Sequence, residues 1–200
     1  MRPSSSMNVW RHATGHLLHL ALILFPTILI SLGSITQYDV LIFAFMIGVA
    51  GLIESILVYP SRKETTDDPR ALQVAAFVGA FMLVMFWTAQ LERQFLSPST
   101  WNLSVFGTVL VVCGIILRAS AIHSLGPRFI SDVHCDGPPV TKGIYRFMRH
   151  PSEIGMLAIA VGGPLILQAP WTAIIAFSVL TPISYWRVLR ENKVLAAAKI

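Results

Sequence analysis

The sequence predicts an all-α integral membrane protein with five or six transmembrane helices and a helical hairpin at the C-terminal end. Of the 200 residues, 54% are hydrophobic and only 12% are charged, whereas a soluble domain usually carries about 25% charged residues. Several apolar runs reach roughly 20 residues, enough to cross about 30 Å of hydrocarbon as a helix. Lys and Arg gather between these runs, as in membrane proteins. We therefore expect residues 1–200 to form a single transmembrane domain.

Four apolar runs in residues 1–122 predict four N-terminal spans. They cover about residues 17–33, 40–59, 71–91 and 103–122. A short polar loop, "PSRKETTDDPR", separates the second run from the third. A longer polar segment, residues 124–151, follows the fourth run and is rich in Gly, Pro and charged residues.

The last apolar block, residues 154–186, is too long for one simple helix. "GGP" at 162–164 and "QAP" at 168–170 interrupt it, and proline ends or kinks helices. A helical hairpin that turns near residues 168–170 gives six passes. A single kinked helix, which gives five, remains the alternative.

The distribution of basic residues predicts the orientation. In the six-pass arrangement, fourteen of the fifteen Lys and Arg residues lie on one side, and only Arg93 lies on the other. The positive-inside rule then places both termini and the polar segment on the cytoplasmic side, of either a bacterial inner membrane or the endoplasmic reticulum. The net charge of +5 does not indicate nucleic acid, because no basic stripe with interleaved aromatic residues is present.

Three polar motifs follow the fourth apolar run in a fixed order. They are "LRASAIHSLGPRF" (117–129), "VTKGIYRFMRHPSEIG" (140–155) and, after the hairpin, "WRVLRENKVL" (186–195). Taken alone, the Arg-His-Pro triplet is typical of a cytoplasmic anchor before a helix that starts with proline. Taken together, the motifs resemble the isoprenylcysteine carboxyl methyltransferase family and, more loosely, the phospholipid N-methyltransferases.

The resemblance covers about residues 117–195 and implies a membrane enzyme that uses S-adenosylmethionine. It implies that residues 123–200 form a cofactor-binding loop, the hairpin and a C-terminal helix end. It also implies that Arg187, one helical turn before Glu191, meets the substrate. The cofactor contacts that it implies are Val140, Tyr145, His150, Pro151, Ser152 and Glu191.

The chain departs from the family pattern where the substrate would bind. Glu153 stands where the family's carboxyl methyltransferases usually have tyrosine, Gly137 where they have histidine, and Asn192 where a closing Glu-Glu pair would end. The sequence also stops at Ile200, before the aromatic tail that many members carry. The fold and cofactor expectations depend less on these positions than the substrate does.

The residue types suit the cofactor's chemistry. Glu191 can accept hydrogen bonds from the ammonium or a ribose hydroxyl, and Tyr145 can pack its ring on the cofactor while its hydroxyl orients it. A helix that begins at Pro151 would present N–H groups and a positive dipole end to the cofactor's carboxylate.

The nucleophile is open between two classes. A carboxylate needs no base, and Arg187 would hold it as a bidentate clamp. An amine or a phenol must lose a proton, and Glu153 or His150 is then the candidate base. Glu153 can instead attract a cationic amine head group. In either case we expect a lipophilic substrate that enters sideways from the membrane lipids, and we expect no metal.

Two other functions remain as alternatives. One is a membrane reductase resembling the sterol reductases, which would bind NADPH. The other is a non-catalytic membrane scaffold or small-molecule binder. Five further residues allow more than one interpretation. Arg118 is either an interfacial anchor or part of the site, and Glu54 either reaches interfacial water or is functional. The histidines at 12, 16 and 19 indicate an amphipathic entry helix rather than a metal site.

Overall fold

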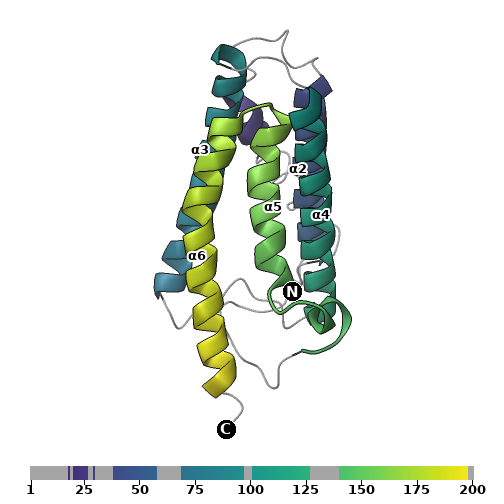
Figure 1. The fold of residues 1–200 in the computed structure, drawn as a ribbon, viewed down its shortest axis with the longest axis vertical. Coiled ribbons are helices and arrows are strands. Elements are labelled where there is room, and N and C mark those ends of the chain that lie inside the picture. Colours follow the sequence, from purple (N-terminus) through teal and green to yellow (C-terminus); the bar gives the residue numbers. More distant parts are fainter. Residues whose placement is uncertain are drawn as a thin grey trace, which may run out of the picture.

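The protein is a bundle of long α-helices that run side by side along one axis (Figure 1). The computed structural model describes residues 18, 20–26, 29, 38–57, 69–96, 101–126 and 140–197. Its elements are α2 (Tyr38–Leu57), α3 (Pro69–Phe95), α4 (Trp101–Leu125), the 3₁₀ helix η3 (Gly143–Arg146), α5 (Pro151–Ile166) and α6 (Pro170–Ala197). Within these ranges no strand occurs, which confirms the all-α prediction.

The observed helices lie over the predicted spans. α3 and α4 extend a few residues beyond both ends of the third and fourth apolar runs, and α2 begins and ends two residues before the second run. Residues 20–26 of the first run are helical. Two helical segments among the described residues, Asn102–Leu125 and Pro170–Lys193, are long and apolar enough to cross a membrane. The number of crossings stays a prediction. Gly137, the histidines at 12, 16 and 19, and the Glu54 side chain lie outside the described residues.

The C-terminal apolar block forms two helices, not one kinked helix. α5 ends at Ile166, and α6 begins at Pro170, so the predicted hairpin is present. Gln168 in the turn has a φ of 59°, a backbone region that ends helix geometry locally. Pro164 lies within α5 and does not end it.

α4 and α5 pack with their backbones almost in contact, because glycines face each other. An added Cβ on Gly155 of α5 would lie 2.7 Å from the carbonyl oxygen of Gly114 on α4. An added Cβ on Gly107 of α4 would lie 2.7 Å from the carbonyl oxygen of Gly162 on α5. Small residues allow such close approach between apolar helices. This contact fixes the start of α5 against the end of α4.

We expect Gly155→Ala to lower the stability of the protein by about 1–3 kcal/mol, because the new methyl group overpacks a backbone contact. Gly79→Ala is the matched control, since an added Cβ there meets nothing within 4 Å. Thermal unfolding in detergent measures both. Equal melting temperatures for the two variants would show that the α4–α5 contact is looser than described.

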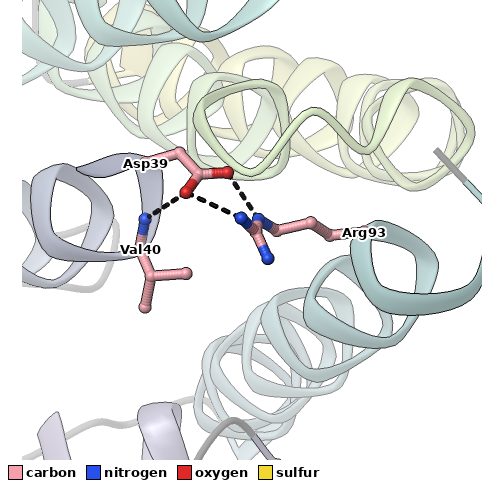
Figure 2. A network of polar contacts seen from close by, with 3 residues as sticks. All are labelled: Asp39, Val40 and Arg93. Carbon is pink, nitrogen blue, oxygen red and sulfur yellow. Dashed lines mark hydrogen bonds and ion pairs between the residues drawn. The ribbon is translucent and has the colours of Figure 1, made fainter. Parts of the chain in front are cut away.

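The end of the bundle at the α5–α6 turn is held by charged side chains. The carboxylate of Glu92 on α3 accepts hydrogen bonds from the backbone N–H groups of Trp171 (3.0 Å) and Thr172 (2.7 Å) at the start of α6. Figure 2 shows Asp39 on α2 facing the guanidinium of Arg93 on α3, where Arg93 Nη2 donates to Asp39 Oδ1 at 2.8 Å. The motif residues lie at the opposite end of the α5–α6 hairpin, at the start of α5 and in the second half of α6.

Candidate active site

The loop before α5 folds back onto the end of α4. Gly143 opens η3 with a φ of +61°, a conformation that side chains with a Cβ rarely adopt. An added Cβ there would also collide with the Ser124 side chain at the end of α4. Glycine at 143 thus allows the turn that carries Tyr145 toward the hairpin.

His150 and Glu191 meet across the hairpin, although 41 positions separate them. His150 Nδ1 lies 2.8 Å from Glu191 Oε2, and the histidine side chain is 13% exposed. Pro151 is at the first turn of α5 and His150 is its N-cap, so the prediction that Pro151 starts a helix is confirmed. The hydrogen bond to Glu191 raises the pKa of His150. A hydrogen bond to Asn192 and the charges of Glu191 and Glu153 add to this rise, and burial opposes it.

The charge of Glu191 affects the pKa of Tyr145. Burial raises the pKa of the Tyr145 phenol to about 12, and the Glu191 carboxylate adds to the rise. A phenol with this pKa stays protonated at physiological pH. Tyr145 can therefore donate a hydrogen bond in the site but cannot serve there as a base.

Glu153 and Arg187 form a second ion pair between α5 and α6. Arg187 Nη1 lies 3.1 Å from Glu153 Oε1, and the two side chains are 22% and 15% exposed. The sequence assigns both residues to the substrate but gives no sign that they bind each other, because the pairing depends on the register of the hairpin.

Arg118 contacts the first turn of α5. Its Nη1 donates to the hydroxyl oxygen of Ser152 at 3.0 Å, which joins the last turns of α4 to the first turn of α5. From the sequence, the position of Arg118 near the end of an apolar run did not decide between an interfacial anchor and a site residue. Asn192, noted only as a departure from the family pattern, also contacts His150.

The site contains polar atoms that lack partners. Within the part of the chain that the structure describes, four buried side-chain atoms have no hydrogen-bond partner: His150 Nε2, Glu153 Oε2, Thr181 Oγ1 and Ser184 Oγ. His150 and Glu153 lie at the start of α5, and Thr181 and Ser184 lie near the middle of α6. Buried polar atoms in folded proteins nearly always have partners, so this seam between the two helices has the properties of a ligand site.

Most of the predicted site residues lie in one cluster, while their roles stay predictions. Tyr145 in η3, His150 and Glu191 form one group, and Glu153 and Arg187 form an ion pair between the same two helices, α5 and α6. Ser152, beside Glu153 in the first turn of α5, bonds to Arg118 of α4. Val140 is half-buried in the segment that leads into η3. Among the described residues, no group of three or more His, Cys, Asp or Glu side chains is arranged to hold a metal ion.

These features define an all-helical apolar bundle with a partly buried polar site at one end. Residues 107–197 match the sequence model of the isoprenylcysteine carboxyl methyltransferase (ICMT) family, so the similarity covers the C-terminal part of the chain, from within α4 to the end of α6. The resemblance seen in the motifs is thereby confirmed.

Curated relatives agree with this match. Protein-S-isoprenylcysteine O-methyltransferases A and B of Arabidopsis thaliana are 36% and 37% identical over 96 residues, which is 46% of this chain and 46% of each relative. The enzyme of the same name from Saccharomyces cerevisiae is 33% identical over 103 residues, covering 50% of this chain and 43% of the relative. The matched region is thus less than half of each relative's length. No solved structure matches this chain.

Proposed function

We propose that this protein is an integral membrane methyltransferase that takes its methyl group from S-adenosylmethionine and acts on a lipophilic substrate at the cytoplasmic face. The observation that carries the proposal is the 2.8 Å contact between His150 Nδ1 and Glu191 Oε2. It joins two motifs on either side of the hairpin, both within the region that matches the family.

The residues around this contact fit S-adenosylmethionine. The cofactor has an ammonium and ribose hydroxyls as donors, and a carboxylate as acceptor. Glu191 offers an acceptor, the protonated Tyr145 phenol offers a donor, and the buried His150 Nε2 lacks a partner among the described residues. The first turn of α5 has no side-chain cap from His150, and its backbone N–H groups suit a carboxylate.

S-adenosylmethionine, when bound, supplies a methyl group on a sulfonium cation. The protein's part is to hold the acceptor in line and to exclude water. Correct positioning alone can lower a barrier by roughly 7–11 kcal/mol. The His150–Glu191 and Glu153–Arg187 pairs join the start of α5 to the second half of α6.

An apolar groove beside the site suits the tail of a lipophilic substrate. It has a volume of about 430 Å³ and lies between α3 and α6. Ile183 in its wall is one helical turn from Arg187. The lining residues are Gln73, Val74, Phe77, Pro182, Ile183 and Trp186. A tail in this groove would leave its head group close to the Glu153–Arg187 pair.

The orientation rests on charge. The described basic residues gather at the end of the bundle that holds the site, where Lys142, Arg146 and Arg149 lie in the loop and Arg190 and Lys193 near the end of α6. Arg93 is at the other end. The positive-inside rule then favours a cytoplasmic site, where a water-soluble cofactor is available.

Cofactor binding tests the proposal directly. The protein purified in detergent should bind S-adenosylmethionine and not NADPH, measured by calorimetry on the same preparation. Binding of NADPH alone would favour a reductase. Binding of neither, by a protein that melts cooperatively, would favour a scaffold and reject the methyltransferase.

The pH dependence of stability tests the His150–Glu191 pair. Because its partners raise the pKa of His150 above the ordinary 6.5, the folded protein holds this proton more tightly than the unfolded chain does. The stabilisation is complete below about pH 6.5 and is lost as the pH rises through the raised pKa. We expect the difference in melting temperature between wild type and Glu191→Gln to be largest near pH 5.5 and to shrink above pH 7. The His150→Gln background should remove that trend, and a trend that persists there would assign it to another group.

A further inference from the structure

The Glu153–Arg187 pair places a carboxylate of the protein where the family resemblance expects a carboxylate of the substrate. Arg187 Nη1 already lies 3.1 Å from Glu153 Oε1, and both side chains are mostly buried. A guanidinium has five N–H donors, so Arg187 can contact a second carboxylate. Two carboxylates that share one buried cation repel each other, however. The pair therefore disfavours an anionic head group.

The second oxygen of Glu153 points to the opposite kind of ligand. Glu153 Oε2 is buried and has no hydrogen-bond partner within the described residues. An ionised carboxylate only accepts hydrogen bonds, and a buried acceptor without a donor costs free energy. A ligand that satisfies this atom must bring an N–H or O–H group.

Two further buried hydroxyl groups without partners among the described residues lie on α6, the helix that pairs with α5 in the hairpin. Met156 and Ala160 of α5 pack with Leu180 of α6 in one apolar cluster. Glu153 is one turn toward the site on α5, and Thr181 and Ser184 follow Leu180 in the same direction on α6. Thr181 Oγ1 and Ser184 Oγ are buried and lack partners among the described residues, as Glu153 Oε2 does. Hydroxyl groups can accept hydrogen bonds as well as donate them, so each of these atoms can accept from a ligand that brings N–H groups.

We infer that the substrate carries an amine head group bound by Glu153, and not a carboxylate bound by Arg187, which makes the reaction an N-methylation and rests on the proposed methyl transfer. In this step the bound ammonium first gives a proton to Glu153 Oε2. The nitrogen lone pair then forms the new N–CH₃ bond while the S–CH₃ bond breaks and its electron pair stays on sulfur. The proton leaves Glu153 for water when the methylated ammonium departs.

Three probes with one tail separate the head groups. They are S-farnesylcysteamine (an amine), 3-(farnesylthio)propionate (a carboxylate) and 2-(farnesylthio)ethanol (an alcohol). Binding is measured in nanodiscs of uncharged lipid, so that the membrane itself does not concentrate the amine. We expect wild type to bind the amine at least ~10-fold more tightly than the other two, since a charged partner strengthens a hydrogen bond to a buried carboxylate.

Two variants test which side chain makes the choice. Glu153→Gln keeps the shape and should abolish the preference for the amine, whereas Arg187→Gln should retain it, because Glu153 remains. Melting temperatures check that both variants fold. If Glu153→Gln does not fold, Glu153→Asp replaces it in the test and should keep part of the preference for the amine. A carboxylate or alcohol probe that binds wild type as tightly as the amine, or an amine preference that survives Glu153→Gln, overturns the inference.

S-adenosylmethionine binding, measured on the same nanodiscs without any probe, keeps the two proposals apart. Its absence rejects the methyltransferase, whatever the probes do. Its presence, together with failure of the amine probe to bind, rejects only the amine head group.

Discussion

Glu191→Ala is expected to weaken the binding of S-adenosylmethionine by about 3 kcal/mol, or roughly 100-fold, because it removes a charged acceptor from a partly buried site. The change also removes the partner of His150 Nδ1, which lies 2.8 Å from Glu191 Oε2. It therefore disturbs the first turn of α5 as well. Calorimetric titration of the cofactor into purified protein measures the loss.

Two controls make this result specific. Lys193→Ala alters an exposed side chain near the end of the same helix and should leave the affinity within about twofold, as expected for a surface change. His150→Ala should reproduce part of the loss if the two residues act together. Equal cofactor affinity in Glu191→Ala and wild type would remove Glu191 from the site and would leave the His150 contact as a structural feature.

The helices could be predicted from the sequence because their signal is local. A run of about 20 apolar residues meets the length requirement of a membrane helix, and α2, α3 and α4 follow the predicted runs closely. The hairpin could be predicted because the polar residue Gln168 and the proline at 170 interrupt the apolar block at the turn. The α4–α5 glycine contact could not be predicted, because it depends on packing between segments far apart in the sequence.

Only those residues of the candidate site that belong to a sequence motif could be predicted. His150 and Glu191 were assigned to one site through the resemblance, since nothing in their spacing brings residues 41 positions apart together. The Glu153–Arg187 pair and the Arg118–Ser152 hydrogen bond depend on the register between helices. An apolar sequence does not encode that register in any simple period.

The two ends of the bundle use charge in different ways. At the site end, buried polar atoms are left without partners among the described residues. At the turn end, Glu92 is satisfied by the start of α6 and by the Thr172 hydroxyl. Incomplete pairing at one end and complete pairing at the other fit a ligand site and a structural clamp, respectively.

Arg93→Ala should therefore be among the most destabilising single substitutions, with an expected loss of about 3–5 kcal/mol in the free energy of unfolding. Asp39 is only 8% exposed, and its Oδ1 accepts hydrogen bonds from Arg93 Nη2 at 2.8 Å and from the Val40 backbone N–H at 3.0 Å. Without Arg93, the buried Asp39 carboxylate loses the guanidinium that faces it (Figure 2). Thermal or denaturant unfolding in detergent measures the change.

A double substitution of Asp39 and Arg93 distinguishes the stability that the intact pair contributes from the stability lost when one partner is left alone. When both members of a buried ion pair become apolar residues of similar size, stability often returns. We therefore expect Asp39→Leu combined with Arg93→Met to be clearly more stable than Arg93→Ala, and Arg93→Lys to fall between wild type and Arg93→Ala, because lysine keeps the charge but not the two-pronged contact. A double variant as unstable as Arg93→Ala would mean that the arginine stem, through its packing, and not the unpaired carboxylate, accounts for the loss.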